Sequence, residues 1–373
     1  MKKMRKVFVV TERRADYSRF KPILTLIKED PCLEYYLAVT GCRLKPEHGN
    51  TIHEIKKDGF KISSELQMFT EKGDSGASMV RAFGRIIQQL TYELEKSQPD
   101  LILAGFDIAA NFAVAIAGAH MNIPVAHIQG GEVSGTIDES IRHAMTKFSH
   151  YHFAANSDAC QRLIKMGERP AHVFNVGCPS IDAIKQVSRI PKKELLSQYH
   201  LKPSYALVLQ HPVTSELTRS SFQIRQTLEA VTKAGLSSLV IYPNNDAGCS
   251  SIIKYITGSS INHVPSLSLE HYVNLLRNCA MLIGNSSSGI HESSTFGIPT
   301  INIGSRQAGR LRSSNIIDVG YDKNEIHEAI ITCKESSAFQ RRCAEAPNPY
   351  GDGKSSQKII NLLKTLSLDE GVI

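Results

Sequence analysis

Short apolar runs recur along this chain, and each is followed by a segment with helical periodicity. In the first part of the chain they span 6–10, 35–41, 101–105, 125–129 and 151–155. A second series, after Gly167, spans 173–176, 205–209, 238–242, 281–284 and 300–303. Strands that alternate with helices form parallel sheets with helices on both faces. The sequence therefore predicts an α/β fold.

A chain of 373 residues exceeds the usual size of a single core, so we expect two similar α/β domains rather than one long sheet. We place the first domain at 1–172 and the second at 173–354. In such sheets, ligands bind outside the carboxyl ends of the strands. A cleft between the two domains would bring both sets of strand ends to a shared ligand.

Composition limits the class of ligand and the compartment. The 43 Lys and Arg residues exceed the 36 Asp and Glu residues without a long basic block, which favours a small anionic ligand over a nucleic acid. The apolar run near the N-terminus is too short for a signal-peptide core, and no stretch is long enough to span a membrane. We expect a cytoplasmic protein.

Cysteine and histidine spacing argues against a metal site. The eight cysteines include no CxxC pair, so we expect reduced thiols rather than a zinc knuckle or a redox motif. His150 and His152 flank Tyr151, which indicates the alternation of a strand rather than a pair of ligands. We expect no metal.

The stretch 124–143 is the strongest candidate for a ligand site in the first half. A short strand ends in Gly130 and Gly131, which allow a tight turn. Charged side chains follow at once, and two of them, four residues apart, share a helix face if 137–147 is helical. The alternative is a surface loop with a solvated helix start. The candidates of this stretch are His127, Gln129, Glu132, Asp138 and Arg142.

Polar residues also follow other predicted strands. Arg14 and Ser18 could reach a phosphate, although a helix cap at Asp16 is an equal alternative. His211 stands at a strand end before a proline, where it is an acid/base or phosphate candidate or a structural histidine. Asn244 lies in a stretch that is typical of a plain turn.

The segment GNSSSGIHE, at 284–292, carries the best phosphate signal. A strand ends in glycine and serines and a helix begins, so backbone N–H groups and the hydroxyls of Ser286 and Ser287 converge where the helix dipole favours an anion. Glu292, one turn into that helix, could accept hydrogen bonds from a ribose diol. The alternative is a serine-rich helix cap. Because the segment is neither GxGxxG nor a P-loop, it supports neither a dinucleotide fold nor ATP hydrolysis.

Taken together, these segments resemble the hydrolysing UDP-N-acetylglucosamine 2-epimerases nearly end to end. The blocks that carry the resemblance are RADYS at 14–18, GNT at 49–51, HIQGGEVSGTIDESIRHAMTK at 127–147, GCPS at 177–180, QHPVT at 210–214, PNNDAG at 243–248, GNSSSGIHE at 284–292 and RQAGR at 306–310. The resemblance implies two Rossmann-like domains facing across a nucleotide-sugar cleft, as in glycosyltransferase-B-like proteins. It also implies that a helix in 355–373 crosses back to the first domain.

The resemblance also implies a reaction. The family eliminates UDP from UDP-N-acetylglucosamine across C1 and C2 to a glycal, and then adds water to release N-acetylmannosamine. Loss of the C2 proton needs a positioned base, and the leaving diphosphate needs groups that hold its charge. The resemblance implies no metal and no cofactor, a nucleotide sugar as the small-molecule partner, and a homo-oligomer, either a dimer or a tetramer.

Roles for individual residues come from the same resemblance. It assigns the diphosphate to Arg14, His211, Ser286 and Ser287. It assigns the ribose to Glu292 and the sugar to Asp107, Asp138, Arg142 and His211, which are the catalytic candidates. The remaining expected binding residues are Ser18, His127, Gln129, Glu132, Gly177, Asn244 and Arg310.

Two departures from the family pattern concern the sugar. The family motif Gly-Asp-Arg-x-Glu/Asp keeps its aspartate as Asp107, but the arginine is Ile108 and the second acid is Ala110. A glutamate common in the sialic-acid enzymes is Gln129, which cannot act as a general base. Acid/base work therefore falls on Asp107, Asp138, His211 or Glu132. A more apolar pocket wall would accommodate a UDP- or GDP-linked 2,4-diacetamido-6-deoxy sugar of the legionaminic-acid type.

Two other functions remain open on the sequence. A glycosyltransferase of the same architecture would need an acceptor surface, and no basic or apolar membrane-docking run is evident. A nucleotide-sugar-binding protein without turnover is suggested by the changes at Ile108 and Ala110.

Overall fold

The computed structural model describes residues 4–45, 51–70, 75–244 and 246–369. The chain forms two compact units: unit 1 comprises Met1–Glu132, Ile137–Ala183 and Tyr350–Ile373, and unit 2 comprises Val133–Thr136 and Ile184–Pro349. Gly49 and Asn50 of the GNT block, Asn245, and the segment 370–373 that we assigned to the last helix lie outside the described residues.

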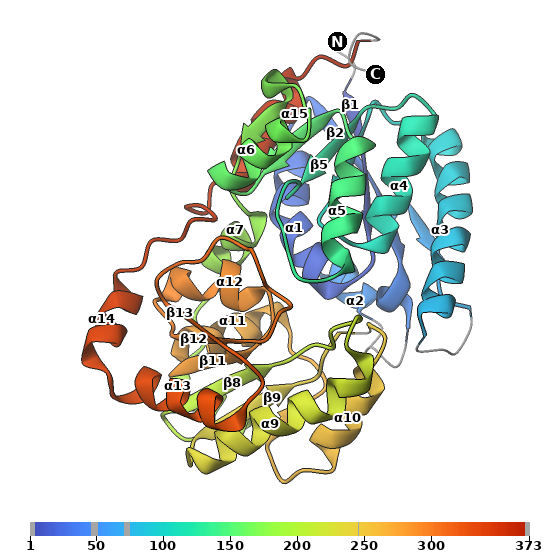
Figure 1. Cartoon of the computed structure of the whole chain (residues 1–373). Coiled ribbons are helices and arrows are strands. Elements are labelled where there is room, and N and C mark those ends of the chain that lie inside the picture. Colours follow the sequence, from blue (N-terminus) through green and yellow to red (C-terminus); the bar gives the residue numbers. More distant parts are fainter. Residues whose placement is uncertain (1–3, 46–50, 71–74, 245, 370–373) are drawn as a thin grey trace. The chain divides into compact units, whose positions relative to one another are not determined.

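Unit 1 contains a parallel sheet with the strand order β3-β2-β1-β4-β5-β6-β7 (Figure 1). Its strands are β1 (Arg5–Thr11), β2 (Leu33–Thr40), β3 (Ser64–Leu66), β4 (Leu101–Gly105), β5 (Val125–Ile128), β6 (Tyr151–Ala154) and β7 (Val173–Asn175). The strand order reverses between β1 and β4, so the loops that follow these two strands diverge. Such a reversal is where open α/β sheets bind ligands.

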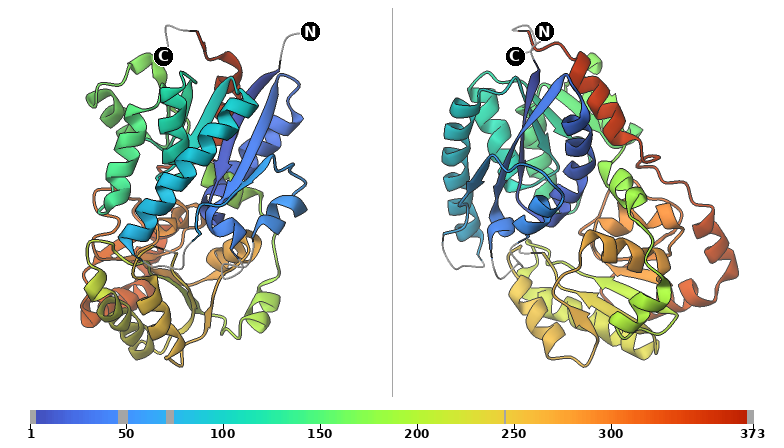
Figure 2. Two further views of the ribbon diagram at one scale, coloured as in Figure 1. Left: turned by 90° about the vertical axis from the view of Figure 1, so that its right-hand side faces the viewer. Right: turned by 180° about the vertical axis from the view of Figure 1, so that it is seen from behind.

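Helices cover both faces of this sheet, as Figures 1 and 2 show. They are α1 (Arg14–Glu29), α2 (Ile52–Lys57), α3 (Gly76–Ser97), α4 (Ala109–His120), α5 (Ile137–Lys147), α6 (Ser157–Lys165), α7 (Pro179–Gln186) and α15 (Ser355–Thr365), with 3₁₀ turns at Gly41–Leu44 and Pro170–His172. Alternate residues of β1 point to opposite faces of the sheet. Val7 and Val9 pack with α1 and α15, whereas Phe8 and Val10 pack with α3 and α4. Burial on both sides explains the continuous apolar run.

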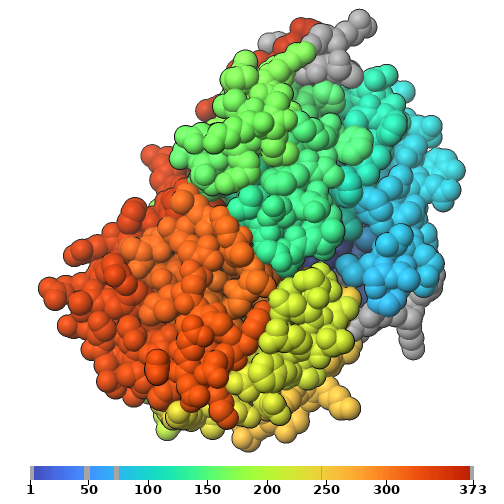
Figure 3. Space-filling view, viewed as in Figure 1, coloured from blue at the N-terminus to red at the C-terminus, as the bar shows by residue number. Residues whose placement is uncertain are grey.

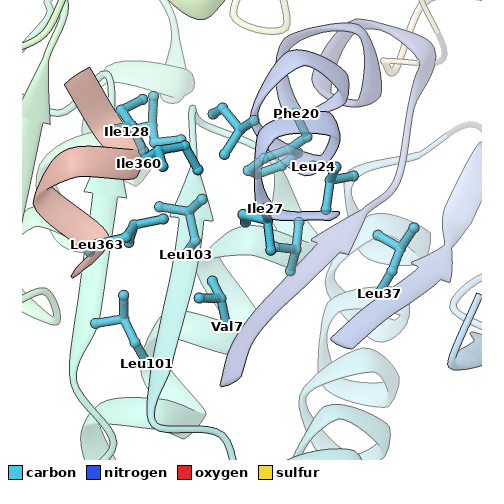
Figure 4. Close-up of a cluster of buried hydrophobic side chains, with 14 of the residues drawn as sticks. Val7, Phe20, Leu24, Ile27, Leu37, Leu101, Leu103, Ile128, Ile360 and Leu363 are labelled. Carbon is cyan, nitrogen blue, oxygen red and sulfur yellow. The ribbon is translucent and has the colours of Figure 1, made fainter. Parts of the chain in front are cut away.

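The residues 7–10 of β1 have no exposed surface, and hardly any of the dark-blue N-terminal segment is visible on the face drawn in Figure 3. The core on the α1 side is shown in Figure 4, where Ile360 and Leu363 of α15 lie in one cluster with residues of α1 and the sheet. Asp182 caps α15, because its carboxylate accepts from the backbone N of Ser355 at 3.1 Å and of Ser356 at 2.6 Å.

Unit 2 contains a second parallel sheet, with the order β10-β9-β8-β11-β12-β13. Its strands are β8 (Tyr205–Leu209), β9 (Ser237–Ile241), β10 (His263–Val264), β11 (Met281–Gly284), β12 (Thr300–Ile303) and β13 (Ile316–Val319). Its helices are α8 (Lys192–Gln198), α9 (Ser220–Lys233), α10 (Cys249–Thr257), α11 (Leu269–Asn278), α12 (Ser288–His291), α13 (Lys323–Glu335) and α14 (Ser337–Ala344), with 3₁₀ turns at Leu217–Arg219 and Ser293–Phe296. The order reverses between β8 and β11. The predicted α/β fold with parallel sheets is confirmed.

One strand joins a different sheet from the one that we predicted. The run 173–176 was assigned to the second half, but β7 pairs with β6 at the edge of the first sheet, and Val176 N donates to Ala154 O at 3.0 Å. The single helix α6 suffices for the crossover between these strands, and periodicity alone does not state which sheet a strand joins. Within the described residues, no helix is both long enough and apolar enough to cross a membrane.

Candidate active site

The turn after β1 is organised by Asp16. Its buried carboxylate accepts from Thr11 Oγ1 at 3.0 Å, from Glu12 N at 2.7 Å and from Arg13 N at 2.9 Å. Asp16 is therefore the helix cap that the sequence allowed as an alternative, but it is buried rather than solvated. The start of α1, which carries the next two phosphate candidates, is fixed at the sheet edge by these bonds.

The two phosphate candidates of α1 both have protein partners. Arg14 Nη2 lies 2.9 Å from Glu54 Oε1 of α2, and the Arg14 side chain is about one third exposed. Ser18 Oγ donates to Ala15 O at 2.9 Å. Arg14 would have to share its guanidinium between Glu54 and an anion, whereas the hydroxyl of Ser18 can accept a further hydrogen bond.

A buried arginine connects the ends of β4 and β5. Arg142 of α5 forms an ion pair with Asp107 and donates to Glu132 O at 2.7 Å. Burial lowers the pKa of Arg142, but the carboxylates of Asp107 and Glu132 outweigh it and hold this pKa above its usual value. Asp107 stays partly exposed, while only 1% of the Arg142 side chain is accessible. The structure thus brings a charged and oriented carboxylate to the edge of the sheet.

Gln129 joins this network through its amide. Its Oε1 accepts from Arg19 Nη1 at 3.1 Å, and its Nε2 donates to Glu132 Oε1 at 2.9 Å. Because an arginine only donates and a carboxylate only accepts, the amide, which does both, satisfies the two neighbours without a charge of its own. A glutamate here would face Glu132 with like charge. Arg19 was absent from our predicted site, since nothing in the sequence pairs it with Gln129.

His127 lies beneath the turn that carries Asp107. It is fully buried, and its Nε2 donates to Phe106 O at 3.2 Å, while no hydrogen-bond partner of Nδ1 occurs among the described residues. Burial lowers the pKa of His127 to about 3. Phe106 has a left-handed φ of 70°, which the bond from His127 helps to hold. His127 is therefore a neutral support of the turn.

Asp138 and Gly177 complete the candidates of unit 1. Asp138 lies in the first turn of α5, one turn before Arg142, as the spacing predicted, and its charge helps to raise the pKa of Arg142. Gly177 has a φ of 88°, and a Cβ there would lie 2.6 Å from Ser355 Oγ. A side chain at this position would therefore collide with the start of α15.

Ile108 and Ala110 are the two positions that depart from the family pattern, and Ala110 lies close to a buried carboxylate. Ile108 is 7% exposed, and Ala110, in the first turn of α4, is fully buried in the apolar cluster between the sheet and the helices α3 and α4. Glu12, from the turn after β1, is also buried, and its Oε2 accepts from Ala110 N at 3.0 Å while its Oε1 lies 3.2 Å from Arg13 Nε. Burial raises the pKa of Glu12. A buried carboxylate from a neighbouring loop therefore lies beside Ala110, and the apolar pocket wall stays a prediction.

In unit 2, His211 follows β8 and Asn285 follows β11, which are adjacent strands at the second reversal of order. Asn285 Oδ1 accepts from His211 N at 2.7 Å, and Asn285 Nδ2 donates to His211 O at 2.9 Å. Asn244 N donates to His211 Nδ1 at 3.0 Å. The structure therefore brings two predicted residues, His211 and Asn244, together. It also adds Asn285, which was not among the predicted site residues.

The serine-rich segment differs from the prediction in one respect. The helix α12 covers only Ser288–His291 and passes into a 3₁₀ turn, so Glu292 follows the last residue of this single-turn helix. Ser286 and Ser287 are half-buried in the loop before it. Glu292 Oε2 accepts from Ser288 Oγ at 2.7 Å, and Ser288 in turn contacts Tyr272 OH. This carboxylate is therefore held in place by the first residue of α12.

Arg310, the last predicted residue, is 9% exposed and donates through Nη1 to His291 Nε2 at 3.0 Å. The neighbouring Gln307 Nε2 donates to Asn285 O at 2.8 Å. The RQAGR block therefore packs against the segment that contains Ser286 and Ser287. Among the described residues, no group of three or more His, Cys, Asp or Glu side chains is placed to hold a metal ion.

Comparison with known proteins gives a consistent result. The family model described as UDP-N-acetylglucosamine 2-epimerase matches residues 25–364. The UDP-N,N'-diacetylbacillosamine 2-epimerase (hydrolyzing) of Legionella pneumophila is 35% identical, over 99% of this chain and 98% of that protein. The UDP-N-acetylglucosamine 2-epimerase of Neisseria meningitidis serogroup B is 34% identical, over 88% of this chain and 87% of that protein.

Solved structures agree on the fold. The crystal structure of UDP-GlcNAc 2-epimerase from Neisseria meningitidis bound to UDP-GlcNAc has a TM-score of 0.83 and 19% identity, and covers 96% of this chain and 99% of that one. A putative UDP-N-acetylglucosamine 2-epimerase from Listeria monocytogenes has the same TM-score at 17% identity, covering 98% and 96%. The similarity confirms the two-domain α/β fold class.

Proposed function

Because the chain belongs to the UDP-N-acetylglucosamine 2-epimerase family, we propose that it is the hydrolysing 2-epimerase that its sequence predicts. It converts a UDP-linked N-acetylglucosamine-type sugar and water to UDP and a free N-acetylmannosamine-type sugar. The observation that supports this most directly is the network of Asp107, Arg142, Glu132 and Gln129 at the strand ends of unit 1.

The first step is elimination. A carboxylate takes the proton from C2, the C1–O bond breaks, and its electron pair leaves with the diphosphate, so that a C1=C2 double bond forms. Asp107 is the first candidate for this base, because its carboxylate is oriented by the ion pair with Arg142 and its side chain stays partly exposed. Asp138 and Glu132 are the other carboxylates of the network.

The leaving diphosphate needs hydrogen-bond donors and positive charge. We assign this role to Arg14, His211, Ser286 and Ser287, and the ribose to Glu292, whose carboxylate is held by Ser288. Ser18, Asn244 and Arg310 complete the proposed UDP site. In the second step water adds its hydroxyl to C1 of the glycal, and a proton returns to C2 on the opposite face of the ring.

Turnover in heavy water tests the reaction. The purified protein is incubated with UDP-N-acetylglucosamine and no acceptor, and the sugar is examined by mass spectrometry and NMR. We expect free UDP and N-acetylmannosamine with deuterium at C2, since the side chain that takes the proton exchanges with solvent. Release of UDP only with an acceptor indicates a glycosyltransferase. Binding without turnover indicates a nucleotide-sugar-binding protein, and a retained C2 hydrogen contradicts elimination.

A second candidate substrate is the UDP- or GDP-linked 2,4-diacetamido-6-deoxy sugar. It is supported by the name of the Legionella relative and by Ile108 in place of the family arginine. The two sugars on the same nucleotide are compared by kcat/KM. A preference of tenfold or more for UDP-N-acetylglucosamine, about 1.4 kcal/mol, excludes the second candidate as the main substrate.

The setting of the reaction follows from the product. We propose that the released amino sugar feeds the synthesis of a sialic-acid-type or legionaminic-acid-type sugar. We also propose a cytoplasmic location, where its eight free cysteines stay reduced, and a homo-oligomer. Light scattering of the purified protein tests the oligomer, since a monomeric mass contradicts it.

A further inference from the structure

Asn285 connects three segments of unit 2 at the reversal between β8 and β11. It is 1% exposed, its N donates to Leu209 O at 3.0 Å, and its O accepts from Gln307 Nε2 at 2.8 Å. Its side-chain amide forms two bonds with the backbone of His211, one as acceptor and one as donor. The backbone of His211 is thus held on both its N–H and its C=O by one side chain.

The imidazole of His211 is oriented by a different group. Asn244 N lies 3.0 Å from Nδ1 of the ring. A backbone N–H can only donate, so Nδ1 must present a lone pair, and the proton of the neutral ring is on Nε2. Protonation of Nδ1 would place two N–H groups face to face. The turn therefore selects one tautomer.

This tautomer limits what His211 can do. A general base needs an unprotonated ring nitrogen in reach of the substrate, but here Nδ1 is occupied by Asn244 N and Nε2 carries the proton. The available chemistry is donation of a hydrogen bond from Nε2 to an anion. A neutral donor that is fixed in advance stabilises developing charge without reorganisation during the reaction.

We propose that Asn285 is a positioning residue which, together with Asn244 N–H, holds His211 as a neutral Nε2–H donor to the leaving diphosphate. His211 then takes no proton from the sugar, so the base is one of the carboxylates of unit 1. This inference rests on the proposed function for the identity of the anion, whereas the tautomer itself rests only on the geometry of unit 2.

The tautomer is measured directly by NMR on protein with ¹⁵N-labelled histidine, with the signals of His211 assigned by their loss in His211→Asn. We expect a protonated Nε2 and an unprotonated Nδ1 in the wild-type protein. The opposite tautomer overturns the proposal. This measurement needs no turnover, so it stands even if the protein fails to release a 2-epimer, which would instead refute the proposed function.

The donor role is tested by two substitutions of His211. The amide nitrogen of glutamine can reach the position of Nε2, whereas that of asparagine reaches only the position of Nδ1. For a donor at Nε2, we expect His211→Gln to keep a kcat at least tenfold higher than that of His211→Asn. Equal loss in the two variants overturns the donor role. Each kcat is calculated per UDP-binding site found by calorimetry, so that unfolded protein does not lower the apparent kcat.

The role of Asn285 is tested by Asn285→Asp. Aspartate keeps the acceptor for His211 N but replaces the donor to His211 O with a second carboxylate oxygen, which that carbonyl repels. We expect kcat per UDP site to fall at least tenfold and the His211 signals to show a mixture of tautomers. The matched control is Asn324→Asp, at an exposed position of α13. A wild-type kcat per site with an unchanged tautomer in Asn285→Asp overturns the positioning role.

Discussion

We expect acidification to lower the free energy of unfolding through protonation of His127 in the unfolded chain. Replacement of His127 should remove this part of the pH dependence. His127 is fully buried and its pKa is lowered to about 3, whereas a histidine in an unfolded chain titrates near 6.5. The folded pKa is depressed, so below the unfolded value the unfolded chain binds a proton that the native protein does not. Stability is present above about pH 6.5 and is lost as the pH falls below it.

The magnitude follows from the difference between the two pKa values. Each pH unit below about 6.5 costs about 1.4 kcal/mol, so the contribution at about pH 5 is roughly 2 kcal/mol relative to about pH 7.5. Burial is the largest cause of the shift, and the bond that His127 donates to Phe106 O opposes it only in part.

The assay is urea denaturation at about pH 7.5 and about pH 5 for the wild type and for His127→Gln, which keeps an N–H donor for Phe106 O. We expect the variant to lose about 2 kcal/mol less than the wild type between the two pH values. His120→Gln, at an exposed position of α4, is the control and should follow the wild type. Parallel losses in the wild type and His127→Gln would refute the reasoning.

Three further predictions concern single substitutions. Gly284→Ala should destabilise the protein by about 2–4 kcal/mol in urea, because φ is 134° and the new Cβ would lie 2.0 Å from Leu209 O; an unchanged midpoint contradicts the strain. Asp182→Ala should cost about 1–2 kcal/mol and raise hydrogen exchange at the start of α15, and protected amides there would argue against the cap. Glu292→Ala should weaken UDP binding by roughly 1–3 kcal/mol in calorimetry, and an unchanged affinity removes it from the site.

The parts of the fold that the sequence predicted are those that local pattern determines. The run 101–105 is β4, since all its residues are buried between two helical layers. The helix predicted at 137–147 has those bounds in the structure, because Asp138 and Glu139 favour its first turn. By contrast, the edge strands β3 and β10 have only three and two residues, too few to show a period, and β7 joins a sheet that only its partner strand defines.

In the candidate site, too, contacts within one helix could be predicted from the sequence, whereas contacts between distant segments could not. Asp138 and Arg142 share a helix face, so their relation could be read from spacing. The pairs Arg19 with Gln129 and Glu12 with Ala110 N are about a hundred residues apart in the chain and become visible only once β1, β4 and β5 lie side by side. Asn285 was visible in the motif, but its partner His211 comes from another strand, and a role of this kind needs the strand order.

The capped helix α15 has a consequence for how the chain folds during synthesis. Unit 2 is almost contiguous, from Ile184 to Pro349, so most of it can fold as soon as it has left the ribosome. Unit 1 lacks Ile359, Ile360 and Leu363 until the last part of the chain is made, and the apolar face over β1 and β4 stays incomplete for that time. For that interval the half-built unit 1 exposes apolar surface that the completed unit buries, and such surface favours aggregation.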